Sequence, residues 1–330
     1  MKNYGFNMLC MFGANSVKPK IDDAELDFIA EHGFNYIRLP LDYRAWIKNF
    51  DYANPDERGL EIVDGYIAQC LERGLHACVN FHRAPGYCIN RPDLERDNLW
   101  TDEIAQDGFV RNWEIFATRY KDIPPEKLSF NLVNEPWWED GKLGFTRERH
   151  AAIMRRAIAA IRAISPDRDI VLDGINGGNT EMPELADTGA IQSVRGYTPF
   201  NVTHYKAGWI SHITDWPEPA YPAEYDGVSW NRDALAHYYR NWRALEKSGV
   251  RVMVGEFGCY DKTPNDVALR WFRDLLSVYR EFGWGFVMWN FNGPFGIVNH
   301  NRPGAKYTTM NGLNVDAEML ALMKENRVNG

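Results

Sequence analysis

Short apolar runs alternate with longer amphipathic runs along the whole chain. The apolar runs have the length and composition of buried strands and cover residues 4–8, 36–39, 75–81, 128–133, 170–173, 191–196, 252–255 and 285–289. Runs with helical spacing lie between them, at residues 23–32, 60–73, 101–120, 147–164, 233–248, 265–282 and 317–326, with a weaker one at 181–187. Several of these helices are followed at once by a glycine in the place of a left-handed cap, among them Gly33, Gly74 and Gly249.

This alternation predicts a parallel sheet covered by helices. Eight strand–helix units in 330 residues fit an α/β fold in which the sheet closes into a (β/α)8 TIM barrel. An open doubly wound sheet is the competing fold, but it usually has a glycine-rich turn after its first strand, and none follows residues 4–8. We therefore predict one catalytic barrel domain over residues 1–330, with an elaborated Pro-rich loop after strand six, between Trp209 and Trp230.

Barrels of this type carry their chemistry at the carboxyl ends of the strands. Polar or aromatic side chains stand at these ends in most of the predicted units: Arg38, His82, Asn134, Glu135, Asp173, Arg195, Tyr197, Glu256, Trp289 and Asn290.

The amino-acid composition limits which classes of binding partner fit this chain. Lys and Arg number 37 against 45 Asp and Glu, so the net charge of −8 lacks the basic surface that nucleic acids or anionic membranes require. No apolar run is long enough to span a membrane. Trp, Tyr and Phe make up 14% of the residues, and such side chains suit flat amphipathic ligands such as sugar rings.

The spacing of the cysteines indicates whether disulfides or a metal site are expected, and the N-terminal residues bear on the cellular location. The five cysteines are irregularly spaced and contain no C-x-x-C, which argues against disulfides and against a zinc site. We expect no metal and no cofactor. The chain as written has no signal peptide, which predicts a cytoplasmic protein; a signal removed beforehand would leave the same sequence, and the protein would then be secreted.

Two motifs place a lone carboxylate at a strand end. Residues 129–138 read SFNLVNEPWW, so Glu135 follows an apolar strand and precedes two tryptophans. Residues 252–260 read VMVGEFGCY, so Glu256 is flanked by small and apolar residues. Burying a carboxylate among such residues costs free energy unless a partner group compensates its charge or the protein uses it in its function.

Two such carboxylates at a barrel mouth are suited to cleaving a glycosidic bond. One, when protonated, gives a proton to the leaving oxygen, and the other attacks the anomeric carbon or directs water to it. A metal-dependent hydrolase is a rival, but the eight histidines form no H-x-H and no H-E-x-x-H. A non-catalytic carbohydrate-binding barrel is a second rival, and it would not need both glutamates.

The motifs taken in order resemble glycoside hydrolase family 5, and within it the bacterial endo-β-1,4-glucanases of the cellulase C type. They are RLP (38–40), NFHRAPG (80–86), NLVNEP (131–136), GEFG (255–258) and WN (289–290). The resemblance implies a retaining double displacement with Glu135 as acid/base and Glu256 as nucleophile. It also implies supporting roles: Arg38 pairs with the nucleophile, His82 and Asn134 contact the sugar, and Trp289 stacks under it.

One motif departs from the family pattern, which has His-x-Tyr at the end of strand six. In one register His204 is this histidine; in the other, which we prefer, Tyr197 is the tyrosine and Arg195 replaces the histidine. The preferred register also aligns His204 and Trp209 with the cellulase C pattern. It predicts that Tyr197 hydrogen-bonds Glu256 and that the permanently charged Arg195 changes the field around the carboxylates.

Substrate choice depends on loops. Trp137, Trp138, Tyr43 and the aromatic residues of the loop after Trp209 either line a sugar cleft or pack as a structural flap. We expect a β-glucan oligo- or polysaccharide as the partner. β-1,4-Glucanase is the favoured activity, with mixed-linkage glucan as a further substrate. An exo-β-1,3-glucanase or β-glucosidase and a β-mannanase are the alternatives, and the sequence does not determine the oligomeric state.

Overall fold

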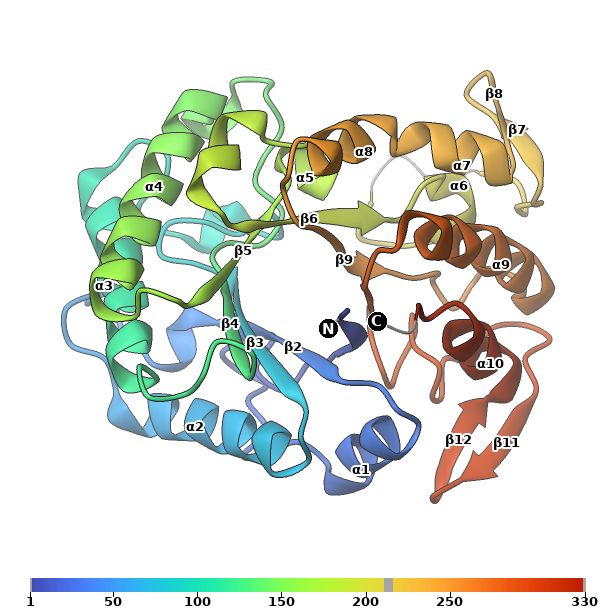
Figure 1. Ribbon diagram of the computed structural model, residues 1–330, viewed down its shortest axis with the longest axis horizontal. Coiled ribbons are helices and arrows are strands. Elements are labelled where there is room, and N and C mark those ends of the chain that lie inside the picture. The colour runs from blue at the N-terminus through green and yellow to red at the C-terminus, as the bar shows by residue number, and fades with distance from the viewer. Residues whose placement is uncertain (1, 211–215, 329–330) are drawn as a thin grey trace. The chain divides into compact units, whose positions relative to one another are not determined.

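The computed structural model describes residues 2–210 and 216–328. Within these residues eight parallel strands close into a barrel in the order β1-β10-β9-β6-β5-β4-β3-β2 (Figure 1). The strands are β1 (Tyr4–Asn7), β2 (Tyr36–Asp42), β3 (His76–Arg83), β4 (Leu128–Asn131), β5 (Asp169–Asp173), β6 (Ile191–Gly196), β9 (Val252–Phe257) and β10 (Phe286–Met288). The predicted (β/α)8 barrel is confirmed.

The chain divides into two compact units. One, called here the β2–β5 unit, consists of Met8–Val194 and Leu245–Val252. The other, the β9–β10 unit, consists of Met1–Asn7, Arg195–Ala244 and Met253–Gly330.

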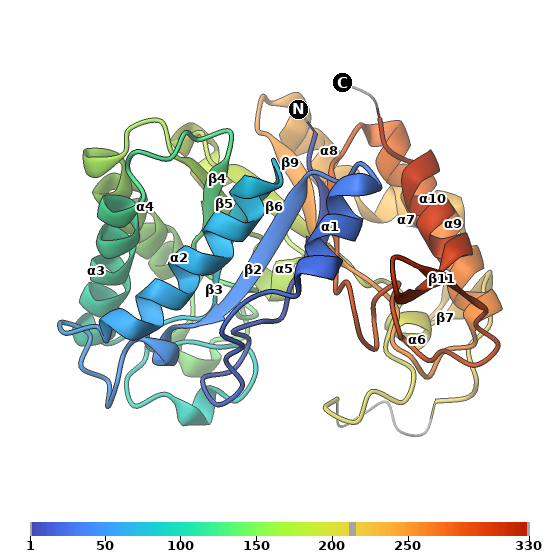
Figure 2. The same ribbon diagram turned by 90° about the horizontal axis from the view of Figure 1, so that it is seen from below.

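Helices cover the strands of the β2–β5 unit on their outer side, and α3 and α4 lie side by side (Figures 1 and 2). These helices are α1 (Asp23–Glu31), α2 (Glu57–Glu72), α3 (Glu103–Arg119) and α4 (Arg147–Ile164). Three of them begin at a side chain that accepts a hydrogen bond from the first turn, which satisfies an amide with no partner in the helix: Asp22, Asp56 and Thr146. The glycines that follow α1 and α2 have φ of 74° and 70°, as the predicted caps require.

Aromatic side chains fill the core between α3 and the strands β3 and β4. The rings of Phe81 and Trp113 stack with centroids 3.9 Å apart, and Phe130 lies 5.2 Å from Trp113. The indole N–H of Trp113 donates to the Leu132 carbonyl at 3.2 Å, so this buried polar group is paired. The packing fixes the carboxyl ends of β3 and β4, from which candidate site residues emerge.

In the β9–β10 unit, α9 (Asn265–Phe282) and α10 (Ala317–Glu325) pack side by side (Figure 2). The Asn7 side chain lies within hydrogen-bond distance of the carbonyls of Gly255 and Met288, both at 3.2 Å, and so links β1 to β9 and β10. None of the helices in the described ranges is both long and apolar enough to cross a membrane.

Several element boundaries differ from the prediction. The helix expected over 233–248 is two helices, α7 (Arg232–Tyr238) and α8 (Arg240–Lys247). The chain breaks at Tyr239, whose buried hydroxyl lies 3.2 Å from the Arg195 carbonyl and 3.0 Å from the Tyr279 hydroxyl. The weak helix at 181–187 is a 3-10 helix, Pro183–Thr188, preceded by a short α5 (Ile175–Gly178).

Two antiparallel hairpins lie outside the barrel. Part of the predicted loop after strand six is the hairpin of β7 (Ala223–Tyr225) and β8 (Val228–Trp230), preceded by a short α6 (Phe200–Thr203); residues 211–215 of that loop lie outside the described residues. A second hairpin, β11 (Tyr307–Met310) and β12 (Leu313–Asp316), precedes α10.

Candidate active site

The segment after β4 carries Asn134 and Glu135. Although β4 ends at Asn131, the backbone still bonds to both neighbouring strands: the Leu132 amide donates to a β5 carbonyl at 3.1 Å, and the Asn134 amide to the Phe81 carbonyl at 3.0 Å. Asn134 is therefore buried, and Glu135 lies half-buried just beyond it. Both residues stand where barrel enzymes carry their chemistry.

A buried ion pair lies beside Asn134. Arg38 on β2 places Nη2 3.4 Å from Oδ2 of Asp173 at the end of β5. Arg38 also donates to Oδ1 of Asn131 at 2.9 Å and to Oδ1 of Asn134 at 2.8 Å. Asp173 accepts from Nδ2 of Asn131 and from the backbone amide of Glu135, each at 3.1 Å. One network therefore joins β2, β4 and β5 and fixes the orientation of the Asn134 amide.

His82 and the loop after β3 lie in the same unit. His82 is buried, and its ring centroid is 4.6 Å from that of the exposed Phe12. Tyr87, farther along the loop, donates its hydroxyl to the Glu135 carbonyl at 2.7 Å. Burial raises the pKa of Tyr87 well above its ordinary value, so the hydroxyl remains a donor.

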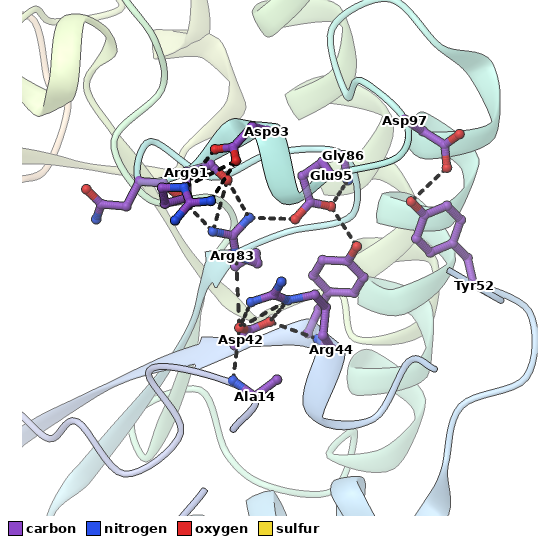
Figure 3. Close-up of polar contacts among 12 residues, drawn as sticks. Ala14, Asp42, Arg44, Tyr52, Arg83, Gly86, Arg91, Asp93, Glu95 and Asp97 are labelled. Carbon is purple, nitrogen blue, oxygen red and sulfur yellow. Dashed lines mark hydrogen bonds and ion pairs between the residues drawn. The ribbon is translucent and has the colours of Figure 1, made fainter. Parts of the chain in front are cut away.

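A buried pair, Arg83 and Glu95, ties this loop together (Figure 3). Their Nη1 and Oε1 atoms are 2.7 Å apart, and the side chains are only 7% and 2% exposed. The Arg83 guanidinium also donates to the Asn90 carbonyl at 2.6 Å, while the other Glu95 oxygen accepts from the Tyr43 hydroxyl at 2.7 Å and the Gly86 amide at 3.2 Å. These bonds connect the start of the loop to its middle and to the segment after β2.

Asp42, the last residue of β2, anchors a second loop beside the first (Figure 3). Its carboxylate accepts from the Ala14 amide at 3.1 Å and from Arg44 at 2.7 Å, and it lies 3.9 Å from Nε of Arg83. The segments around Ala14, Asp42 and Arg83 are thus held together by ionic and hydrogen bonds.

Glu256 is held by two side chains from the end of β6 and the residue beyond it. In the β9–β10 unit, Arg195 donates from Nη2 to Oε1 of Glu256 at 3.1 Å, and the Tyr197 hydroxyl donates to Oε2 at 3.0 Å. All three side chains are buried. The hydrogen bond from Tyr197 that the preferred motif register predicts is present, and Arg195 forms a buried ion pair with Glu256.

Aromatic rings surround Tyr197 in the same unit. The His204 ring lies 5.2 Å from that of Tyr197, and burial lowers the pKa of His204 to about 3, so the imidazole is neutral at neutral pH. Nδ1 of His204 is 2.9 Å from the Thr203 hydroxyl. Trp209 is 57% exposed and packs edge-on against Tyr260 at 4.8 Å, which leaves much of the indole accessible to a ligand.

The remaining predicted site residues lie at the ends of β4 and β10. The Trp289 side chain is half-buried, and its amide donates to the Phe257 carbonyl at 2.8 Å. Trp137 is half-buried, and its carbonyl accepts from the Asn176 amide at 3.0 Å. Trp138 packs against Trp137 at 5.2 Å and is 42% exposed.

Each unit thus brings together part of the predicted set. Arg38, Asn134 and the Glu135 backbone meet in the β2–β5 unit, and Arg195, Tyr197 and Glu256 meet in the β9–β10 unit. The pairing of Arg38 with Glu256 stays a prediction.

Sequence reasoning gave no role to two residues that contact the Glu135 backbone. Asp173 was recognisable only as a polar residue at a strand end. Tyr87 was recognisable only as the residue that follows the NFHRAPG motif (80–86).

No group of three or more His, Cys, Asp or Glu side chains is arranged to hold a metal ion in the described part of the chain. The five cysteines are buried, unbridged thiols. The polar groups that contact Glu135 and Glu256 include the Asp173 carboxylate, the hydroxyls of Tyr87 and Tyr197 and the Arg195 guanidinium.

Known proteins show similarity over nearly the whole chain. Residues 2–294 match the model of Cellulase (glycosyl hydrolase family 5). Endoglucanase C of Acetivibrio thermocellus is 27% identical over 308 residues, which cover 86% of this chain and 87% of that protein. A crystal structure described as a glycoside hydrolase is 55% identical, with a TM-score of 0.97 and coverage of 99% and 100% of the two chains.

A more distant structure, Cel5A of Thermotoga maritima in complex with mannotriose, is 22% identical, with a TM-score of 0.78 over 97% of each chain, and shares the fold. The match to the family model covers far more than half of the sequence, and it includes every predicted catalytic and supporting residue. The chain belongs to glycosyl hydrolase family 5.

Proposed function

We propose that this glycoside hydrolase is a retaining endo-β-glucanase that cleaves β-1,4-linked glucan, mixed-linkage glucan included, with both units acting as one catalytic domain. The observation that carries the proposal is the setting of Glu256. It lies on a barrel strand with one oxygen bonded to Tyr197 and the other to Arg195. A buried carboxylate oriented through both oxygens is suited to act as a nucleophile, because it has little freedom to turn away.

In the first step of the proposed reaction, an oxygen of Glu256 bonds to the anomeric carbon while the bond from that carbon to the glycosidic oxygen breaks. Glu135 gives its proton to the departing oxygen. In the second step Glu135 takes a proton from water, whose oxygen bonds to the anomeric carbon as the ester to Glu256 breaks. Two inversions retain the configuration, and this chemistry calls for carboxyl groups about 5 Å apart.

The supporting residues would orient the sugar and the two carboxyl groups. Asn134, fixed through its oxygen by Arg38, can donate its amide to a sugar hydroxyl, and His82 can contact the same sugar. Trp289 would stack under the ring. Farther along the glucan, the half-buried Trp137 and the exposed Trp209 offer aromatic surface, with neutral His204 beside Tyr197.

The choice of a β-glucan is supported by the names of relatives. The matched proteins include Endoglucanase C of Acetivibrio thermocellus and, at 23% identity, Cellodextrinase A of Ruminococcus flavefaciens. A panel of soluble β-1,4-, β-1,3- and mixed-linkage glucans and β-mannan tests this choice. Internal cleavage of β-1,4-glucan is expected. Release of terminal glucose alone, or faster cleavage of β-1,3-glucan or mannan, would replace it with one of the alternative activities.

Azide rescue tests the two catalytic roles. Glu256→Ala should abolish hydrolysis, and azide should restore turnover of an activated aryl cellobioside with α-glycosyl azide as the product, since azide takes the place of the missing nucleophile. Glu135→Ala should lose most of its activity on substrates with poor leaving groups, and azide should yield the β-glycosyl azide. Glu61→Ala, an exposed change on α2, is the matched control and should behave as the wild type. Wild-type turnover in either catalytic variant would refute the assignment.

A further inference from the structure

The backbone of Glu135 has an unusual conformation. Its φ is 43°, in the left-handed region that residues with a side chain rarely adopt. Such a conformation persists only where the surrounding structure holds it, and it sets the direction in which the side chain leaves the backbone. The contacts of the two peptide groups that flank the Glu135 Cα are therefore informative.

Asp173 holds the peptide group on the N-terminal side. Its Oδ2 accepts from the Glu135 amide at 3.1 Å. The carboxylate is itself fixed, because Asn131 donates to Oδ1 at 3.1 Å and Arg38 lies 3.4 Å from Oδ2. These three partners are all donors, so Asp173 supplies acceptors on both oxygens, and it is buried at the end of β5.

Tyr87 holds the peptide group on the C-terminal side. Its hydroxyl donates to the Glu135 carbonyl at 2.7 Å. The ring is buried and packs edge-on against Trp100 at 4.9 Å, and the Tyr87 backbone forms two hydrogen bonds with Ala84, at 2.8 and 2.9 Å. The hydroxyl is thus carried by a loop segment that is itself bonded in place.

We propose that Asp173 and Tyr87 are positioning residues that clamp the backbone of Glu135 and thereby aim its carboxyl group at the leaving oxygen. The inference rests on the proposed role of Glu135 as acid/base and adds two residues to it. With both flanking peptide groups held, the carboxyl can move only by rotation of its own side chain. A general acid works only within hydrogen-bond distance of the oxygen it protonates. Loss of either hydrogen bond to the Glu135 backbone therefore moves the proton away from that oxygen.

The clamp makes a prediction that a purely structural role does not. Protonation matters for a leaving group that is a sugar hydroxyl and matters little for 2,4-dinitrophenolate, which leaves without a proton. A misdirected acid therefore lowers kcat/KM selectively on cello-oligosaccharides. General damage to the fold or to substrate binding lowers kcat/KM on both substrates alike.

Tyr87→Phe and Asp173→Asn are the test variants. The first removes one hydroxyl and keeps the ring packing. Asp173→Asn keeps the side-chain volume but replaces one of the two acceptor oxygens with an NH2 group, so the donors that now use both oxygens have only one. Tyr66→Phe is the matched control, because Tyr66 is a buried tyrosine on α2 whose hydroxyl donates to the Lys18 carbonyl. Glu135→Gln serves as the reference for complete loss of the acid.

The experiment compares kcat/KM on cellotetraose and on 2,4-dinitrophenyl β-cellobioside, with melting temperatures as a check on folding. We expect kcat/KM of Tyr87→Phe and Asp173→Asn to fall about tenfold or more on cellotetraose and less than about threefold on the aryl substrate. The loss on cellotetraose is a part of the rate gain of about 10²–10⁴-fold that a general acid supplies. Tyr66→Phe should lose equally little on both substrates.

The outcomes separate the clamp from the proposed function. If Glu135→Gln shows no selective loss on cellotetraose, the acid/base assignment fails and the clamp fails with it. If Glu135→Gln shows the selective loss but Tyr87→Phe, folded like the wild type, loses equally on both substrates or not at all, the clamp alone is overturned. Asp173→Asn tests the clamp in the same way from the other peptide group. In the double variant Tyr87→Phe/Glu135→Gln, the loss on cellotetraose relative to the aryl substrate should be no larger than in Glu135→Gln alone.

Discussion

Arg195 stands where the family resemblance leads us to expect a histidine. Its guanidinium remains charged at every working pH, and it lies 3.1 Å from Glu256 in a buried ion pair. A histidine at this place would lose its charge near neutral pH. The charge beside Glu256 is therefore constant across the pH range in which the enzyme works.

Removing this charge should slow the first chemical step. In Arg195→Met the Glu256 carboxylate loses the charged donor to its Oε1 atom, so it is held less firmly in position. A hydrogen bond to a charged group is worth about 1.5–3 kcal/mol, so we expect kcat/KM for an activated aryl cellobioside to fall about tenfold or more. Arg195→Lys, which keeps a charged donor, is the control and should lose less activity. Equal losses in the two variants, with circular dichroism showing both folded, would contradict this account.

At the level of elements, the Arg83–Glu95 pair bonds to Gly86 and Asn90 in the loop over residues 84–102 and to Tyr43 after β2, and we expect it to order this loop. The loop includes Tyr87, so its order bears on Glu135 as well.

Glu95→Gln should loosen this loop. Removing the charge of one partner from a buried pair costs about 3–5 kcal/mol, because the other charge stays buried without compensation. We expect a lower free energy of unfolding in urea and faster amide hydrogen exchange concentrated at residues 84–102. Asp93→Asn is the control: Asp93 forms an exposed pair with Arg91 in the same loop, and its loss should leave the melting temperature unchanged. Exchange that stays as slow as in the wild type would show that the pair does not order the loop.

The barrel strands could be predicted because they are short runs rich in apolar residues, separated by longer amphipathic runs. The hydrogen bond from Tyr197 could be predicted from the register of the motif around Arg195. The two hairpins were missed although the sequence carries their signal. Asp226-Gly227 and Asn311-Gly312 form two-residue turns with positive φ at both positions, from 50° to 78°, as type I′ turns require. The break at Tyr239 was not predictable, since it depends on partners 40 and 44 residues away.

The partners of Asp173 lie beyond prediction for a similar reason. They become neighbours only when β2, β4 and β5 pair, and no local pattern in the sequence reports which buried donors then meet its carboxylate.

At the scale of the whole molecule, a buried histidine links stability to pH. His150 on α4 is fully buried beside Trp100 and Phe145, and burial, with the charge of Arg147 as a smaller cause, lowers its pKa to about 3. In the unfolded chain a histidine takes up a proton near pH 6.5. Between about pH 6.5 and 3 the unfolded state therefore binds more protons at this residue, and stability is lost as the pH falls through this range.

His150→Leu should make stability less sensitive to acid. A histidine buried in its neutral form adds at most about 1.4 kcal/mol per pH unit to the slope of the free energy of unfolding against pH. His150→Leu should remove most of this contribution between pH 6.5 and 4. Urea unfolding at several pH values measures the slope. The exposed His237→Gln serves as control and should leave the slope as it is. A slope unchanged in His150→Leu would show that this histidine does not govern the acid response.

We infer that Glu256 bonds to the anomeric carbon during turnover. 2,4-Dinitrophenyl 2-deoxy-2-fluoro-β-cellobioside tests it directly, because the fluorine slows the second step and lets the glycosyl-enzyme accumulate. Mass spectrometry of the intact and digested protein should find one added fluorocellobiosyl group, attached to Glu256 in the segment 252–260. Attachment to another residue, or no adduct together with an inverted product from cello-oligosaccharides, would contradict the account.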